Sequence, residues 1–475
     1  MNTSRFSRCI FALLSCLLIF LLAACGETGV NPPSTGSPTS TVNPSKTPLP
    51  GSSPTLTPTV TVTTAPVPPT QTSCPPAGTV RAAVTAPLAL GKDANIVYLV
   101  TEYNYTLSTS ASTLKRFDVT TGAKTEILKM PGVTFGSPQV SADGQWILFV
   151  TSMGQHDELQ MVRMDGKGLQ TLYCLPAGGI QKALWSTNQQ QVLISASAAP
   201  NGFTGLYLLN IVNGTIAQVL KPTPVSNPVL GSVFVDAITW LNNTQVYVRF
   251  GDYPIVPATK IGLLNTDRGV QTISDLKTVF QQTLGSPHNY PCFDADSSYD
   301  ASTLFVSLCG GISAPNCSGS CSLGTREGPS TINTERAIGG ATNTILSSQT
   351  LGIASVRAVT SNTLLLVVHN FSENHTFDPS QNGLWRVASS GSGLTRLTTE
   401  ANGAVTSLCL FSQNPWSNLS RDGSMYAFQT MTTSYPETDT LAFGQLSGGA
   451  PQTLASIAET SISNTHLELI GWTTM

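Results

Sequence analysis

The feature that most constrains the fold is a unit of two β-hairpins that recurs along the chain. In the first half of the unit, an apolar strand leads through a polar turn into a second apolar strand, as at 140–144 followed by 146–149. In the second half, another hairpin turns at Asp165-Gly166 or at Asn213-Gly214. These dipeptides supply the positive φ that tight hairpin turns require. Each unit therefore predicts four short antiparallel strands.

The unit recurs about seven times. Its second strand begins at intervals of roughly 45 to 62 residues, near Val97, Ile147, Val192, Val246, Leu304, Leu364 and Tyr426. Four strands repeated at this spacing indicate a β-propeller. A long β-sandwich is the alternative, but a sandwich would not reuse one four-stranded unit.

The two ends of the repeat region predict how the ring closes. The first copy shows three strands, at 96–101, 114–119 and 124–128, but no clear inner strand. The last segment, 465–473, has the pattern of an inner strand with no strands after it. We expect it to complete the first blade, which would remove exposed strand edges. The prediction is an all-β propeller of seven four-stranded blades, or eight if 79–90 adds strands of its own.

Two copies identify a family. Residues 140–172 contain a serine-x-Asp-Gly turn, a strand and an Asp-Gly hairpin, and residues 419–428 contain the first half of this pattern. Both segments resemble the TolB-like (WD40-like) propeller repeats. The hallmark of those repeats is Trp-Ser-Pro-Asp-Gly, and no copy here keeps the proline. The resemblance covers about 92–475 and implies the fold, not an activity. The α/β N-terminal domain of TolB itself has no counterpart here, so we expect a TolB-like protein that is not TolB.

The N-terminus has the pattern of a bacterial lipoprotein signal. Arg5 and Arg8 precede a 13-residue, largely apolar stretch at 10–22, which is too short to span a bilayer. Leu22-Ala23-Ala24-Cys25 looks like a lipobox, in which Cys25 is acylated and becomes the new N-terminus. An ordinary secretory signal is the alternative. We expect residues 1–24 to be removed and the protein to be held outside the cytoplasm, on the bacterial cell membrane, by lipid on Cys25.

A linker separates the anchor from the repeats. Residues 25–78 are rich in proline, serine and threonine, and this composition favours extended, unpacked chain. The prediction is therefore a signal peptide at 1–24, a disordered linker at 25–78 and a propeller domain at 79–475. Charged residues make up only 10% of the chain, with a net charge of -3 and no basic tract. We therefore expect no nucleic-acid partner.

No residue pattern predicts catalysis or a cofactor. The turns at Ser141/Asp143 and Ser420/Asp422 fit side chains that bond local backbone amides. No Gly-x-Ser-x-Gly elbow is present, and the five histidines show no metal-ligand spacing; His369 and His375 flank a turn without further ligands. Asp294, Asp296 and Asp300 alternate in one loop, but this loop lacks the other ligands of a calcium site, so a solvated turn is favoured.

Cysteines are consistent with an oxidising compartment. Seven lie beyond Cys25, and four of these crowd into the fifth repeat, namely Cys292, Cys309, Cys317 and Cys321. Four cysteines allow three pairings, which the sequence does not select among. A zinc site is the alternative, although the spacing is not that of a standard zinc knuckle.

These observations favour a monomeric cell-surface lipoprotein whose propeller is a binding or scaffold module for an extracytoplasmic protein or glycan. Propellers place recognition in loops at their two faces, and no titratable residues concentrate here as catalysis usually requires. The alternative is a propeller enzyme of the lyase or hydrolase type, whose residues would converge at the central channel from several blades. A propeller domain with a purely structural or sensory role is a third hypothesis.

Overall fold

The fold is that of a computed structural model of the whole chain. The structure describes residues 74–79, 88–152, 156–175, 178–197, 204–221, 233–252, 260–281, 288–289, 293–298, 300–308, 311–313, 326–327, 330–336, 342–360, 362–369, 379–401, 403–409, 417–432, 435–460 and 462–475. Cys25 and the predicted signal and linker up to residue 73 lie outside this part of the chain.

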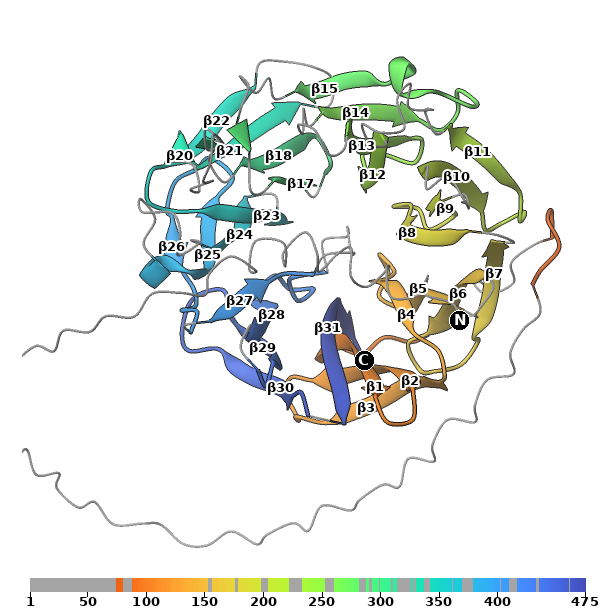
Figure 1. Cartoon of the computed structure of the whole chain (residues 1–475), viewed down its shortest axis with the longest axis horizontal. Coiled ribbons are helices and arrows are strands. Elements are labelled where there is room, and N and C mark those ends of the chain that lie inside the picture. The colour runs from red at the N-terminus through yellow and green to blue at the C-terminus, as the bar shows by residue number, and fades with distance from the viewer. Residues whose placement is uncertain are drawn as a thin grey trace, which may run out of the picture. The chain divides into compact units, whose positions relative to one another are not determined.

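Seven antiparallel sheets of four strands form a ring, which confirms the predicted seven-bladed propeller (Figure 1). We number them as blades 1 to 7 and give the strands of each from the innermost outward. Blade 1 consists of β31 (Ser463–Thr474), β1 (Ala94–Asn104), β2 (Thr109–Asp118) and β3 (Lys124–Pro131). Blade 2 consists of β4 (Phe135–Val140), β5 (Trp146–Ser152), β6 (Asp157–Arg163) and β7 (Gln170–Leu175). Blade 3 consists of β8 (Gly179–Trp185), β9 (Gln191–Ser197), β10 (Thr204–Asn210) and β11 (Ile216–Leu220).

Blades 4 to 7 repeat this order. Blade 4 consists of β12 (Val233–Trp240), β13 (Gln245–Asp252), β14 (Lys260–Asn265) and β15 (Lys277–Gln281), and blade 5 of β17 (Phe293–Ser297), β18 (Thr303–Leu308), β21 (Ser330–Arg336) and β22 (Asn343–Ser348). Blade 6 consists of β23 (Ile353–Thr360), β24 (Thr363–Val368), β25 (Gly383–Ala388) and β26 (Thr395–Arg396). Blade 7 consists of β27 (Ala404–Ser407), β28 (Met425–Thr432), β29 (Thr438–Gln445) and β30 (Gln452–Ala458).

Three very short strands and two 3₁₀ turns lie outside the blades in the described part of the chain. The strands β16 (His288–Asn289), β19 (Gly311–Ser313) and β20 (Arg326–Glu327) form a small sheet of their own. The 3₁₀ turns are η2 (Ile273–Asp275) and η3 (Pro379–Gln381). No helix among the described residues has the length and apolar character needed to cross a membrane.

The ring closes through the C-terminal strand, as the sequence predicts. β31 pairs antiparallel with β1 from Ala94↔Thr474 to Asn104↔Ser463, with one irregularity after Val97. The strand predicted at 465–473 is therefore real and slightly longer than expected. Because the last strand of the chain completes the first blade, the two ends of the repeat region hold the ring shut.

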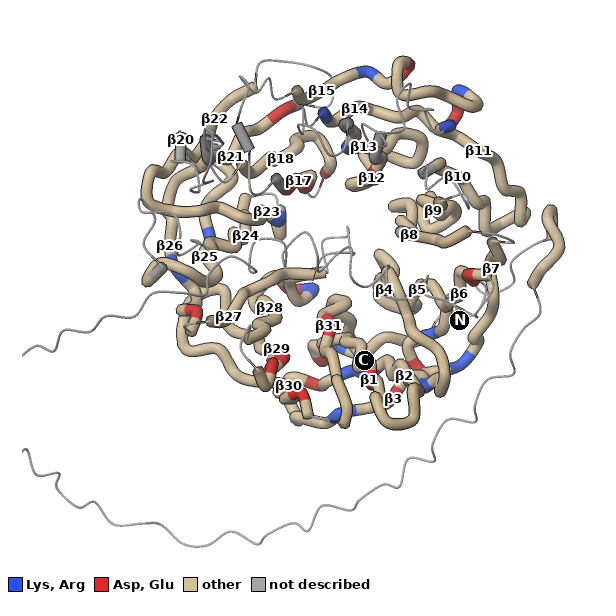
Figure 2. Tube along the Cα trace, in the orientation of Figure 1, with Lys and Arg blue, Asp and Glu red and all other residues tan. Residues whose placement is uncertain are grey.

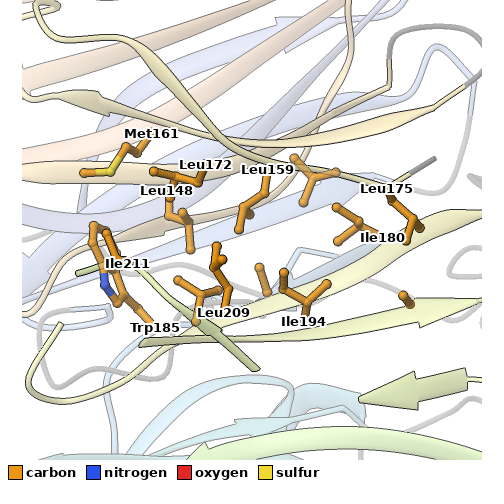
Figure 3. Close-up of a cluster of buried hydrophobic side chains, with 14 of the residues drawn as sticks. Leu148, Leu159, Met161, Leu172, Leu175, Ile180, Trp185, Ile194, Leu209 and Ile211 are labelled. Atoms are coloured by element: carbon orange, nitrogen blue, oxygen red, sulfur yellow. The ribbon is translucent and has the colours of Figure 1, made fainter. Parts of the chain in front are cut away.

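Both faces of each blade are buried, which explains why the strands are apolar at consecutive positions. In β5, Trp146 and Leu148 face blade 3, whereas Ile147 and Phe149 face blade 1, because successive side chains of a strand point to opposite faces. Seven hydrophobic clusters result, one between each pair of neighbouring blades. Figure 3 shows the cluster between blades 2 and 3, where Leu159 and Leu172 face Ile194 and Leu209.

Polar side chains join neighbouring blades as well. In four blades, a side chain near the start of the third strand accepts a hydrogen bond from a backbone N–H of the next blade's inner strand. These pairs are Ser112 with Phe135 at 3.0 Å, Asp157 with Ile180 at 2.8 Å, Ser330 with Ile353 at 3.4 Å and Asp439 with Leu467 at 3.0 Å. We call them the inter-blade hydrogen bonds. An inner strand has no strand on its channel side, so these acceptors satisfy amides that would otherwise lack a protein partner.

The closing strand should carry a large share of the stability. Trp472 of β31 is fully buried in the cluster between blades 7 and 1, and its indole Nε1 has no hydrogen-bond partner. We predict that Trp472→Ala lowers the free energy of unfolding by about 3–5 kcal/mol, because it leaves a cavity at the closure. Trp472→Phe keeps most of the apolar volume and loses no hydrogen bond, so it should cost clearly less. Urea unfolding of the full chain measures both, and equal losses would contradict this account.

Candidate binding surface

The side chains of the serine-x-Asp-Gly turns form hydrogen bonds with the backbone of the same turn. Ser141 Oγ accepts the N–H groups of Gln145 and Trp146 at 3.1 and 2.9 Å, and it donates to Asp143. Ser420 and Asp422 repeat this geometry, with Ser420 Oγ accepting the Met425 N–H at 2.9 Å. The glycine that follows each aspartate has positive φ, +75° at Gly144 and +71° at Gly423. These pairs bond local backbone amides, as predicted.

The solvated turn predicted for Asp294, Asp296 and Asp300 is right only for Asp300, and the three acids do not converge. Asp294 and Asp296, both in β17, accept hydrogen bonds from backbone N–H groups of β23 in blade 6. Asp294 also forms an ion pair with the buried Arg357. Asp300, in contrast, accepts hydrogen bonds from Ser298 and Ser302 within its own turn. The first two acids therefore join blades 5 and 6, and the third stabilises a turn.

Burial sets the electrostatics of this junction between blades 5 and 6. Burial raises the pKa of Asp296 to about 6, although the charge of Arg357 and the hydrogen bond from Ala358 work in the opposite direction. For Arg357, burial alone would lower the pKa, but the charges of Asp294 and Asp296 outweigh it and the pKa is raised.

Each histidine whose side chain is described contacts an acid. His156 lies 3.1 Å from Glu158, His369 lies 3.1 Å from Glu400, and His466 lies 3.2 Å from Asp439. The side chain of His288 and all of His375 lie outside the described residues, so the distance between His369 and His375 is not described either.

The four cysteines of the fifth repeat, Cys292, Cys309, Cys317 and Cys321, also lie outside the described residues. The disulfide in the described part of the chain is a different one. It joins Cys74 to Cys174 across 100 residues, with the Cα atoms 5.7 Å apart. The sequence does not reveal this pairing, because the two cysteines meet only when the chain before blade 1 lies against blade 2.

Three loops of blades 7 and 1 lie next to one another. They are 433–437 between β28 and β29, 459–462 between β30 and β31, and 105–108 between β1 and β2. Backbone hydrogen bonds join the first loop to the second, from Glu459 N to Glu437 O at 2.7 Å, and the third to the second, from Tyr105 N to Ile462 O at 3.0 Å. We call the described residues of these loops, 435–437, 459–460, 462 and 105–108, the three-loop surface.

This surface carries most of the large apolar side chains that the described part of the chain exposes. Six such side chains are more than about 40% exposed, and four of them lie here: Tyr105, Leu107, Tyr435 and Ile462. The other two, Val212 and Val270, lie near turns between the third and fourth strands of blades 3 and 4, and those turns are at the opposite strand ends. An exposed cluster of this kind on one side of a protein is typical of an interaction site.

The same surface is acidic. Glu437 and Glu459 lie beside the exposed side chains, and the three loops contain no lysine or arginine. Tyr105 Oη donates a hydrogen bond to Glu459 Oε1 at 2.9 Å, and the Tyr103 and Tyr105 rings contact edge to face. Figure 2 shows several acidic positions around β29, β30 and β31. Partial burial, together with the charges of Glu459 and Asp439, raises the pKa of Glu437.

One histidine, His466, lies among these acids. The hydrogen bond to Asp439, together with the charges of Asp439, Glu437 and Glu459, raises the pKa of His466 against a smaller opposing effect of burial. The arrangement as a whole can attract a positively charged group and pack apolar groups around it, since aromatic rings and carboxylates both favour cations. Sequence reasoning missed this surface because its three loops are far apart along the chain; the dipeptide Tyr435-Pro436 and the isolated Leu107 give no signal individually.

Comparison with known proteins shows likeness only at the level of the fold. No protein-family model matches the sequence, and no curated protein sequence is similar to it. Among solved structures, a prolyl endopeptidase from a study of two such enzymes has a TM-score of 0.51 at 11% identity, covering 77% of this chain and 50% of that one. TolB from Acinetobacter baumannii has a TM-score of 0.38 at 12% identity, covering 62% of each chain.

A third neighbour is the β-propeller domain of the Trilobed protease from Pyrococcus furiosus, with a TM-score of 0.48 at 10% identity, covering 76% of this chain and 94% of that domain. The present chain spans about half the length of the prolyl endopeptidase and 62% of TolB. At 11% identity, the similarity to the prolyl endopeptidase shows the shared fold alone.

The pair His466–Asp439 gives the surface a pH-dependent stability. Because the folded pKa of His466 is raised, the contribution of the pair is fully present below the unfolded pKa of about 6.5 and is lost as the pH rises through the folded value. We predict that His466→Gln destabilises the full chain by up to about 1 kcal/mol at pH 6 and by much less at pH 9, since exposure of this side chain limits the gain.

Urea unfolding at the two pH values measures this difference. In the background of Asp439→Asn, the His466→Gln effect should lose most of its pH dependence, because only the charges of Glu437 and Glu459 still raise the pKa of His466. A histidine effect that is the same at both pH values would contradict the assignment.

Proposed function

We propose that this chain is a lipid-anchored protein outside the cytoplasm whose propeller binds a protein partner through the three-loop surface. The observation that carries the proposal is the coincidence of four exposed large apolar side chains with Glu437 and Glu459 on adjacent loops of blades 7 and 1. The rest of the propeller serves to hold these loops in place.

The chemistry of the surface suggests the chemistry of the partner. A lysine or arginine side chain of a partner can pair with the carboxylates and pack against the tyrosine rings, and neighbouring apolar side chains of the partner can cover Leu107 and Ile462. Charge attraction would speed association and weaken at high salt. We therefore favour a protein segment with positive charges flanked by apolar residues over a neutral glycan.

The anchor rests on the sequence pattern that ends at Cys25. A positively charged start, an apolar stretch of 13 residues and small residues before a cysteine are the parts of a lipoprotein signal. The disulfide Cys74–Cys174 is in keeping with a compartment outside the cytoplasm, where disulfides persist. The proline-rich linker would hold the propeller on the order of 100 Å or less from the membrane.

The enzyme alternative needs several acids or histidines at one point of the channel. Among the described residues, one group of three or more cysteine, histidine or acidic side chains lies close enough together to hold a metal ion. This group includes a residue of β7, the outermost strand of blade 2, and does not lie at the channel. Asp294, Asp296 and Arg357, on inner strands, bind one another or backbone groups. The binding proposal therefore has an observation in its favour that the enzyme alternative lacks.

The anchor is tested by acyl labelling. Cells that express the full chain and grow with a radioactive or alkynyl fatty acid should label it, and Cys25→Ala should abolish the label, because this thiol is the acylation site. Cys409→Ala is the matched control, since that buried cysteine should have no part in labelling. Label that persists in Cys25→Ala would overturn the lipoprotein assignment.

The binding surface is tested by photo-crosslinking in intact cells. A benzophenone amino acid at position 107 should crosslink to a protein, whereas the same group at position 212 should not, although both native side chains are more than half exposed. Adding Glu437→Gln and Glu459→Gln should reduce the crosslink at position 107 several-fold, because the attraction for a cation is lost.

A peptide binding assay gives a defined probe for the same surface. A fluorescent peptide of alternating lysine and leucine should bind the full chain more tightly than one of glutamate and leucine, and its affinity should fall with salt. Equal binding of the two peptides, or a position-107 crosslink that survives the double variant, would refute the cationic partner. A crosslink to glycan alone would refute a protein partner.

A further inference from the structure

Four side chains that bind metals well meet at the outer edge of blade 2. Cys74, His156, Glu158 and Cys174 each offer one ligand atom, and these atoms all lie within 4.8 Å of one another. Zinc bonds of about 2.3 Å to sulfur and 2.0 Å to nitrogen place tetrahedral ligand atoms about 3.3–3.8 Å apart. The four atoms are near enough to close on one ion after a small shift, once the two sulfurs, now 2.10 Å apart, have separated. We call these residues the outer-edge cluster. Neither the proposed binding surface nor the anchor involves them.

The register of blade 2 explains why three of them meet. Glu158 of β6 pairs directly with Cys174 of β7, so their side chains lie on the same face of the sheet. His156 stands two residues before Glu158, and a spacing of two returns to the same face of an extended chain. The fourth member, Cys74, comes from the segment 74–79, which lies near blades 2 and 3 and donates a hydrogen bond from Gly78 N to Gly214 O at 3.0 Å (Figure 1).

The carboxylate of Glu158 is held in place from behind. Its Oε2 accepts hydrogen bonds from Gln160 Nε2 at 2.7 Å and Thr171 Oγ1 at 3.2 Å, while its Oε1 lies 3.1 Å from His156 Nε2. The residue is only 5% exposed. Metal ligands in proteins are commonly oriented by such outer hydrogen bonds. One carboxylate oxygen is therefore fixed by the sheet, and the other lies beside the histidine.

We propose that the outer-edge cluster is a zinc site that alternates with the Cys74–Cys174 disulfide. In the oxidised chain the two sulfurs are bonded to each other, and the cluster lacks its thiolates. A dithiol or phosphine reductant supplies two electrons, which break the S–S bond, and two protons give two thiols. Binding of Zn²⁺ then releases both thiol protons to solvent, and two thiolates, one imidazole nitrogen and one carboxylate oxygen surround the ion.

The exchange has a structural consequence. In both states Cys74 remains joined to blade 2, through sulfur in one and through the metal in the other. The segment that leads into the propeller thus stays in place when the disulfide is reduced, provided zinc is present. The cysteine is exposed and accessible to a reductant, whereas Glu158 is buried beneath it.

Cobalt(II) is the probe for this site, because thiolate ligation gives it intense near-ultraviolet absorption and tetrahedral geometry gives it visible bands. The full chain, reduced by a phosphine, should bind Co²⁺ with these bands, and Zn²⁺ should displace it. The oxidised chain should not show them at this site. His156→Ala and Glu158→Gln should each weaken Zn²⁺ binding by about tenfold or more, since each removes a ligand.

His466→Ala is the matched control, because it removes a histidine beside an acid at a distant position, and its Zn²⁺ affinity should equal that of the wild type. Other cysteines of the chain also become thiols on reduction, so the assignment rests on the difference between His156→Ala and His466→Ala. Glu158→Gln keeps the shape of the side chain, so a loss of Zn²⁺ affinity in this variant reports the lost ligand and not a lost fold. Unchanged affinity in His156→Ala and Glu158→Gln, or equal Co²⁺ spectra of the reduced and oxidised chains, would overturn the proposal.

Discussion

The contacts between neighbouring blades are the interaction on which the whole structure depends. No blade has a core of its own, since each sheet is apolar on both faces and buries them only against the next sheet. The inter-blade hydrogen bonds add direction to this packing, because a side chain of one blade accepts an amide of the next blade's inner strand. The same bond from Leu467 to Asp439 operates at the closure, so the ring ends with the interaction that it repeats elsewhere.

Closure also places the candidate binding surface. β31 belongs to blade 1, while the strands before it belong to blade 7. The loop that leads into β31 therefore lies between a loop of blade 7 and a loop of blade 1. Asp439 takes part in both arrangements: it accepts the Leu467 N–H that joins the blades and contacts His466 beside the three-loop surface. The geometry of this surface therefore depends on the same strand that holds the ring shut.

Much of the fold could be predicted from the sequence, because its signals are local. The apolar runs and the turns at Gly166 and Gly214, both with positive φ, give the strand pairs of each blade without any long-range information. Even the closing strand is visible, since the first copy lacks an inner strand and 465–473 supplies one. The sites were less predictable. The sequence predicts a solvated turn for Asp294 and Asp296, yet their carboxylates bind another blade, because alternation along a strand points both toward the next inner strand.

The sequence by itself determined the repeating unit and the way in which the ring closes, and it favoured seven blades over eight, because apolar runs and turn residues act between neighbours in the chain. Only the tertiary structure decided which distant residues meet. Cys74 finds Cys174 rather than a cysteine of the fifth repeat, and Tyr105 lies beside Glu459, 354 residues away. The physical reason is that curvature around a ring, and not any local preference, brings these positions to the same place.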